Sequence, residues 1–160
     1  NQTDGSIQFP QSTSAGIYLG GTAAANKLDD YEEGTWVIGL TFGGASVGMT
    51  AAVTDGTYTK VGNLVTCTGY FALTDVGSST GDAVITGLPF AVSGLNGGYS
   101  ALSIRNIRIS FADQVDGNTV KSGTTITLSE STNAGVITSL TNGNFGDTSG
   151  FIMSVTYRTV

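Results

Sequence analysis

Apolar and polar residues alternate with a period of two along several stretches of this 160-residue chain, and no other feature constrains its fold as strongly. Successive side chains of a β-strand point to opposite faces, so this period places the apolar residues of each stretch on one face. The residues expected to point into a core are Trp36, Ile38, Leu40 and Phe42, then Val65, Cys67, Phe71 and Leu73, then Ile126 and Leu128, and finally Phe151, Met153, Val155 and Tyr157. No stretch shows a convincing helical period, and the pattern therefore predicts an all-β protein.

Turn-forming residues separate these stretches. Gly62-Asn63 lies between two β-prone runs, which is a strong signal for a two-residue hairpin. The segments VDGNTV and TNGNFG are rich in residues that tolerate positive φ, and we interpret them as turns. Short strands joined by such turns predict an antiparallel β-sandwich, or jelly-roll-like head, over residues 35–160. Residues 1–34 have weak periodicity and are interpreted as a short extended N-terminal connector that also serves as a trimerisation segment.

The phase of the alternation changes within the segment YSALSIRNIRISF. Leu102 and Ile104 share one parity, whereas Ile107 and Ile109 share the other. A β-bulge near Arg105-Asn106 would restore the register, because a bulge inserts one extra residue into a strand.

Charged residues make up only 11% of the chain, against about 25% in ordinary soluble proteins. The net charge is −6, and no cluster of Lys and Arg offsets it, which argues against binding to nucleic acid or to anionic membranes. No apolar run approaches the ~20 residues of a membrane span. The polar surface must consist largely of hydroxyls and amides, which suits an extracellular or virion location. The chain has no histidine, its single cysteine is expected to be buried, and no cofactor is expected.

Four of the twelve acidic residues gather in the segment LDDYEEGTW, residues 28–36: Asp29, Asp30, Glu32 and Glu33. If the segment is extended, Asp30 and Glu32 lie on one side roughly 6–7 Å apart, a spacing compatible with a pair of glycosidase carboxylates. A catalytic pair, a calcium site and a structural role are therefore the alternatives. We favour the structural role, in which the carboxylates accept backbone N–H groups or pair with Lys27, Lys60 or an arginine of a neighbouring chain. No catalytic residue and no metal site is predicted.

A second acidic segment, FADQVDGNT at residues 111–119, contains Asp113, Asp116 and Asn118. These oxygen ligands could hold calcium, but Asp-Gly-Asn is also an ordinary turn. We favour the turn.

Three stretches together resemble the C-terminal region of bacteriophage tail fibre and tailspike-like proteins. They are LDDYEEGTW, then YTKVGNLVTCTGYF at residues 58–71, then ITGLPF at residues 85–90, and the resemblance covers about residues 28–90. That family usually continues GTW with Thr-Pro, whereas this chain has Val37-Ile38. The resemblance implies a homotrimeric β-rich head at the tip of a virion fibre that binds the host surface, often through a glycan. The trimer interface is expected to include Leu28, Asp29, Asp30, Tyr31, Glu32, Glu33 and Trp36.

Two loops have the composition expected of a glycan-binding site. An aromatic ring can stack on the C–H face of a sugar, while amides and carboxylates hydrogen-bond to its hydroxyls. The residues that fit this chemistry are Asn96 and Tyr99 in one loop and Asn142, Asn144, Phe145 and Asp147 in the other. We therefore predict a fibre-tip domain that binds a host receptor without catalysis. The alternatives are a glycan depolymerase that uses acidic residues and a purely structural virion knob.

Overall fold

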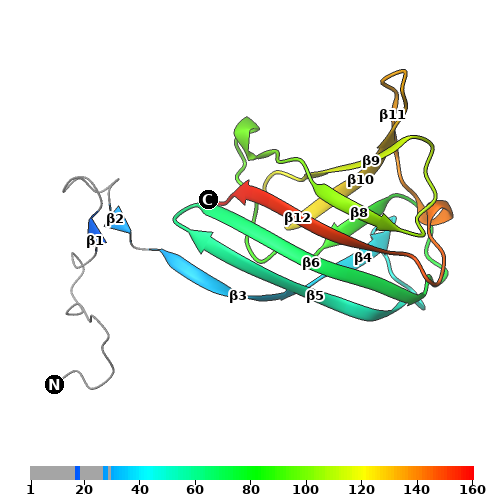
Figure 1. Ribbon diagram of the computed structural model, residues 1–160, viewed down its shortest axis with the longest axis horizontal. Helices are drawn as coiled ribbons and strands as arrows, with labels where there is room; N and C mark the ends of the chain where they lie inside the picture. The colour runs from blue at the N-terminus through cyan, green and yellow to red at the C-terminus, as the bar shows by residue number, and fades with distance from the viewer. Residues whose placement is uncertain (1–16, 19–26, 29) are drawn as a thin grey trace.

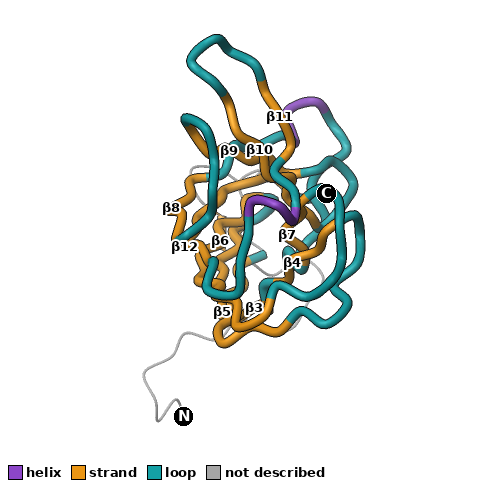
Figure 2. The backbone as a smooth tube through the Cα atoms, turned by 90° about the vertical axis from the view of Figure 1, so that its right-hand side faces the viewer, coloured by secondary structure: helices purple, strands orange, loops and turns teal. Residues whose placement is uncertain are grey.

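The structure, a computed structural model, describes residues 17–18, 27–28 and 30–160 and consists mainly of two five-stranded antiparallel sheets. The front sheet, which faces the viewer in Figure 1, has the order β3(Tyr31–Val37), β5(Thr50–Val61), β6(Leu64–Asp75), β12(Gly150–Arg158) and β8(Ser103–Ile107). The back sheet contains β4(Gly39–Phe42), β7(Ala83–Thr86), β10(Thr125–Ser131), β11(Ile137–Ser139) and β9(Gln114–Thr119). A further pair joins β1(Ile17–Tyr18) to β2(Lys27–Leu28). Figure 2 shows the two sheets as separate layers, so the predicted all-β, sandwich-like fold is confirmed.

The longest element is the hairpin of β5 and β6, and its turn is the predicted Gly62-Asn63. Val61 pairs with Leu64, which leaves only these two residues in the turn. Gly62 has a φ of +57°, a conformation that glycine adopts without steric cost. The hairpin prediction is therefore confirmed.

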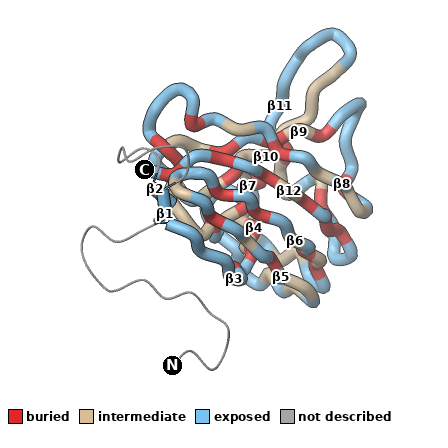
Figure 3. The backbone as a smooth tube through the Cα atoms, turned by 60° about the vertical axis from the view of Figure 1, so that its left-hand side comes forward, coloured by how far each residue is buried: buried red, intermediate tan, exposed pale blue. Residues whose placement is uncertain are grey.

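The core lies between the two sheets and contains every residue that the alternation assigned to it. Figure 3 shows the buried and exposed residues alternating along the front strands. Phe71 and Phe151 come from neighbouring strands, and their rings stack at 5.2 Å between centroids. Cys67 is fully buried, and this burial raises the pKa of its thiol to about 12. The thiol is therefore a small core side chain, as predicted.

The run from Trp36 to Phe42 crosses from one sheet to the other. The alternation predicted a single strand, but β3 ends at Val37 and belongs to the front sheet, whereas β4 begins at Gly39 in the back sheet. Ile38 lies between them with 1% of its surface exposed, so the alternation continues across the change of sheet. The front sheet also begins at Tyr31, which pairs with Val61, so residues 31–34 belong to the sheet rather than to the predicted connector.

Two local predictions are wrong. The register of β8 with β12 is continuous from Ser103 to Ile107, and the chain instead changes direction at Arg108, whose φ is +51°. The segment Asp116-Gly117-Asn118 is not a turn but the middle of β9. Gly117 serves close packing there, because a Cβ atom on it would lie 2.8 Å from the carbonyl oxygen of Thr127.

The two ends of the sandwich carry different loops. We call the end where β3 begins the near end; there the Gly62 N–H donates to the Asp30 carbonyl at 2.7 Å, and the Ser93 N–H donates to the Arg158 carbonyl at 2.7 Å. At the opposite, far end, the Ser110 N–H donates to the Asn144 carbonyl at 2.8 Å. The η2 turn (Asn96–Gly98) follows Ser93, and the η3 turn (Asn142–Asn144) lies at the far end.

Candidate functional site

The carboxylates of the acidic segment at residues 30–33 all interact with side chains of the same chain. Asp30 forms an ion pair with Lys60, Glu32 accepts the hydroxyl of Tyr58 at 2.5 Å, and Glu33 accepts the hydroxyl of Tyr31 at 2.9 Å. These hydrogen bonds to carboxylates raise the pKa of both tyrosines. The carboxylates therefore have structural partners, and Lys60 is one of those that the sequence suggested. Asp29 lies outside the described residues.

Lys60 is a buried cation, because its side chain has only 9% of its surface exposed. Its Nζ lies 5.4 Å from the centroid of the Phe90 ring, in addition to its ion pair with Asp30. This arrangement ties the start of the front sheet to the loop after β7. A buried lysine needs such partners, because an unpaired charge away from water is costly.

Of the residues predicted at a trimer interface, Trp36 is buried in the core and its indole N–H donates to the Thr68 carbonyl at 3.2 Å. It is therefore not available to a neighbouring chain. Leu28 and Tyr31 are exposed apolar side chains, and Tyr31 has 61% of its surface exposed. The trimer itself stays a prediction.

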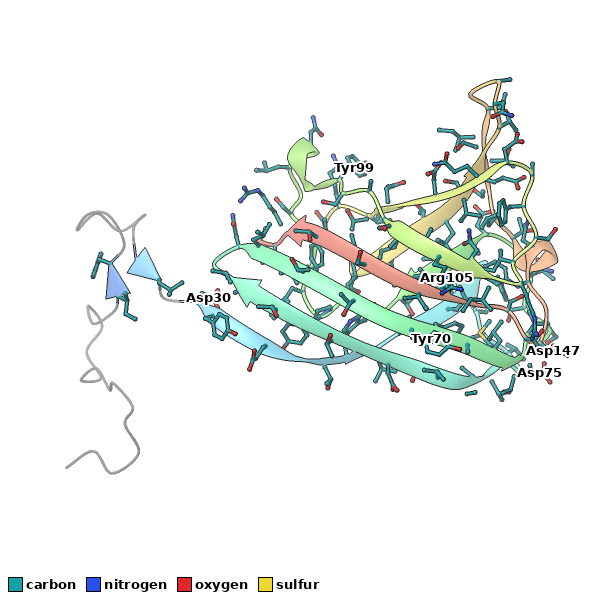
Figure 4. The ribbon with its side chains drawn as sticks, in the orientation of Figure 1. Asp30, Tyr70, Asp75, Tyr99, Arg105 and Asp147 are labelled. Atoms are coloured by element: carbon teal, nitrogen blue, oxygen red, sulfur yellow. The ribbon has the colours of Figure 1, made fainter. Side chains whose placement is uncertain are left out.

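The two predicted receptor loops lie at opposite ends of the sandwich and do not form one site. Figure 4 shows Tyr99 toward the near end and Asp147 at the far end, beside Asp75. The Asp147 carboxylate accepts the N–H of Val76 at 3.0 Å, which holds the loop after β6. The composition of the loops had suggested a common site, but one loop precedes the start of β12 at Gly150, whereas the other follows Ser93, which hydrogen-bonds to Arg158 at the end of β12.

Phe145 is not a receptor-stacking residue, because only 8% of its surface is exposed. Its ring lies 5.3 Å from that of Phe42 in the core. The two asparagines beside it are also structural: Asn142 Oδ1 accepts the N–H of Gly81 at 3.0 Å, and Asn144 Nδ2 donates to the Ser110 carbonyl at 2.7 Å. Phe145 therefore cannot stack on a ligand as predicted, and both asparagines hydrogen-bond to the backbone of the chain itself.

Tyr99 and Asn96 keep the surface position that the prediction requires. Tyr99 is 55% exposed, and Lys121 Nζ lies 4.9 Å above its ring. The same Nζ donates to Asn96 Oδ1 at 2.9 Å. The lysine thus fixes the tyrosine and the asparagine relative to each other.

The possible calcium ligands at residues 113–118 already have partners. Asp113 accepts the N–H of Asn133 at 3.1 Å, and Asp116 accepts the hydroxyl of Ser131 at 2.6 Å. Within residues 17–18, 27–28 and 30–160, no group of three or more His, Cys, Asp or Glu side chains has an arrangement that could hold a metal ion. Residues 114–119 of this segment form β9, which pairs with β10.

The outer face of the front sheet carries two parallel rows of exposed or partly exposed side chains that cross all five strands. The strand register places the members of each row beside one another. The hydroxyl row, from β3 to β8, is Thr35, Thr57, Thr68, Ser154 and Ser103. The mixed row, in the same order, is Val37, Asp55, Tyr70, Ile152 and Arg105.

Two hollows between these rows form what we call the front groove. The first measures about 430 Å³ and extends from β3 to β6; the second measures about 590 Å³ and extends from β6 to β8. Both are lined by Thr68 and Gly69 of β6, so the two hollows adjoin there and together extend from β3 to β8. Each volume lies within the range of about 300–1,000 Å³ that is usual for ligand sites. Both hollows are open, so a ligand would lie along the sheet.

The front groove combines the groups that bind a polar ligand with a nonpolar face. Tyr70 is 40% exposed at its centre, and Figure 4 shows Tyr70 and Arg105 on the sheet that faces the viewer. Thr57 and Thr68 hydrogen-bond to each other at 2.9 Å, which orients both hydroxyls. Neither Asp55 nor Arg105 has a hydrogen-bond or ion-pair partner among the described residues.

Sequence reasoning missed the front groove, although the alternation that turns Val65, Cys67 and Phe71 inward also turns Thr66, Thr68 and Tyr70 outward. The alternation tells which residues point outward, but the rows depend on which strands are neighbours. Arg105 lies in the same row as Tyr70 only because β8 pairs with β12 and β12 pairs with β6. These contacts connect distant parts of the chain.

Comparisons with protein-family models, with curated proteins and with solved structures find no match to this chain. The resemblance to tail fibre proteins therefore stays a prediction. In the described part of the chain, no helix has the length and apolar character needed to cross a membrane.

Proposed function

We propose that this chain is a non-catalytic attachment domain that binds a glycan in the front groove. The observation that carries the proposal is the front groove, whose two adjoining hollows together cross the five strands. The exposed ring of Tyr70 lies beside the hydroxyl row, in the same row as the charged side chains of Asp55 and Arg105. This position replaces the predicted loop at residues 142–147. The loop with Asn96 and Tyr99 is a second candidate because Lys121 orders it and leaves Tyr99 exposed.

The chemistry of the front groove suits a saccharide. A tyrosine ring offers a nonpolar surface to the C–H face of a sugar, and threonine hydroxyls both donate to and accept from sugar hydroxyls. Because the groove is open, a single contact should be weak, with a Kd near millimolar, or about −4 kcal/mol. Several copies acting together would raise the avidity by roughly 10²–10⁴.

A hydrolytic function has less support. Glycosidases need two carboxyl groups about 5–9.5 Å apart across the scissile bond. Asp55 is the only acidic residue among those lining the two hollows of the front groove. Asp30 and Glu32, the pair that the sequence suggested, are engaged by Lys60 and Tyr58. We therefore propose binding without turnover.

Self-association is proposed to use the near end of the same face. Tyr31, Val61 and Leu64 are neighbours in register on β3, β5 and β6, and all three are exposed apolar side chains. They lie four residues along the strands from the row of Thr35, or roughly 13 Å away. Trimer contacts there would bury apolar surface and leave the front groove open. This arrangement agrees with the fibre tip, and with the virion location, that the resemblance implies.

The proposal is tested by a glycan array and by whole-cell binding with wild type, Tyr70→Ala and Tyr99→Ala, each in its native oligomeric state. Tyr70→Ala should abolish binding, whereas Tyr99→Ala should retain it. If only Tyr99→Ala lost binding, the site would be the loop at the near end. The proposal would fail if the wild type bound no glycan and no cell. It would also fail if the protein released reducing sugars from the array, because that would show hydrolysis.

A further inference from the structure

We propose that the front groove binds its saccharide in one orientation, with an anionic group of the sugar against Arg105. The inference rests on the proposed function, since it specifies the ligand class of the same groove. It follows from the distribution of charge along the mixed row, which has Asp55 on β5 and Arg105 on β8.

Arg105 is available to a ligand. Three of the six basic residues, Lys60, Lys121 and Arg158, donate to side-chain oxygens of the chain itself. Arg105 is exposed, lines the second hollow and has no such partner among the described residues. In a chain with so few charges, a guanidinium in a hollow that pairs with no described carboxylate is the group most suited to bind an anion. Its planar fork matches the two oxygens of a carboxylate or phosphate.

The neighbours of Arg105 complete the donor set. Ser103 and Ser154 are paired in register in the adjacent row, and both line the same hollow. Their hydroxyls can donate to the oxygens of an anion that the guanidinium holds. Tyr70 lies beyond Ile152 in the mixed row, so a sugar ring attached to the anion would extend toward the aromatic ring.

The other end of the groove has the opposite charge. Asp55 and Arg105 are separated by three strand spacings, or roughly 15 Å. The Asp55 carboxylate would repel a second anion and would accept hydrogen bonds from neutral sugar hydroxyls. The ligand is therefore an oligosaccharide with an anionic group at one end and a neutral, hydroxyl-rich end at the other.

An array of acidic glycans tests this assignment. Each carboxylated polysaccharide is printed beside the same material after chemical reduction of its carboxyl groups, and each phosphorylated glycan beside its phosphatase-treated form. The proteins are wild type, Arg105→Gln and Arg108→Gln, the last being an exposed arginine that does not line the groove. Tyr70→Ala reports on the groove itself.

Loss of a charge-assisted hydrogen bond should weaken binding about tenfold or more. Wild type should therefore prefer the untreated glycans by that factor, Arg105→Gln should lose the preference, and Arg108→Gln should keep it. If reduction of the carboxyl groups removes binding, the anion is a carboxylate. If phosphatase treatment removes binding, the anion is a phosphate. Binding that requires Tyr70 but survives both treatments would overturn this inference alone, whereas binding that ignores Tyr70, or no binding at all, would overturn the proposed function as well.

Discussion

Replacing Phe145 by alanine tests whether the far-end loop belongs to the core or to a binding surface. The Phe145 ring is 8% exposed and packs 5.3 Å from Phe42, so its removal leaves a cavity between the sheets. A buried Phe→Ala substitution costs about 3–5 kcal/mol. For a domain of this size each kcal/mol lowers Tm by about 2–4 °C, so we expect Tm to fall by roughly 6–20 °C.

The matched control is Tyr99→Ala, which removes an exposed aromatic ring of similar size. A surface substitution of this kind changes stability by less than about 0.5 kcal/mol, or about 2 °C in Tm. Phe145→Leu refills part of the cavity and should cost less than Phe145→Ala. The measurement is calorimetry with urea unfolding as a second readout. If Phe145→Ala melted with wild type while Tyr99→Ala lost stability, the assignment of the two loops would be reversed.

Three further predictions concern stability. Lys60→Ala should lower the free energy of unfolding by about 1–3 kcal/mol in a urea titration, because it leaves Asp30 without its partner and also removes the packed aliphatic stem. Lys60→Met keeps most of the stem and should cost less. Equal costs would show that packing of the stem contributes nothing. Burial holds the pKa of Cys67 at about 12, against 9.0 for a free thiol, so this group stabilises the fold below pH 9 and that contribution is lost as pH rises toward 12. Cys67→Ala should therefore show a weaker alkaline loss of stability than wild type, and an identical pH profile would contradict the assignment. Gly135→Ala should cost about 1–2 kcal/mol for its φ of +77° alone, since a Cβ atom there meets nothing within 4 Å. Gly77→Ala has a similar φ of +74° but would place its Cβ atom 2.4 Å from the Val47 carbonyl oxygen, so it should cost clearly more, and a smaller loss at Gly77 would contradict the packing of that loop.

Local patterns in the sequence predicted the strands and their buried faces. The alternation around Val65 and Val155 identifies the inner face without knowledge of the partner strands, and Gly62-Asn63 defines its own hairpin. The change of sheet at Ile38 does not interrupt the alternation, because the same residue parity points into the core in β3 before it and in β4 after it. The sequence pattern therefore gives no sign of this change. At Gly117, close packing against Leu102 and β10 outweighs the turn preference of Asp-Gly-Asn.

The candidate site was harder to predict, because its residues come together only through the sheet order. Phe145 occurs in a loop rich in Gly and Asn, where no periodicity reports burial, and its contact with Phe42 joins opposite halves of the chain. Tyr70 was placed on the outer face correctly, but its neighbour Ile152 and the more distant Arg105 belong to β12 and β8. Composition suggested which side-chain chemistry would suit a sugar, but it could not tell where such side chains come together.

The central claim is that a glycan binds in the front groove, and chemical-shift mapping tests it most directly. The oligosaccharide with the strongest signal on the array is titrated into isotopically labelled protein, and the amide and tyrosine ring resonances are followed. We expect shift changes at Tyr70, Thr57, Thr68 and Arg105, with the loops at residues 95–99 and 142–147 unchanged. Shift changes confined to either of those loops, with the front groove unaffected, would contradict it.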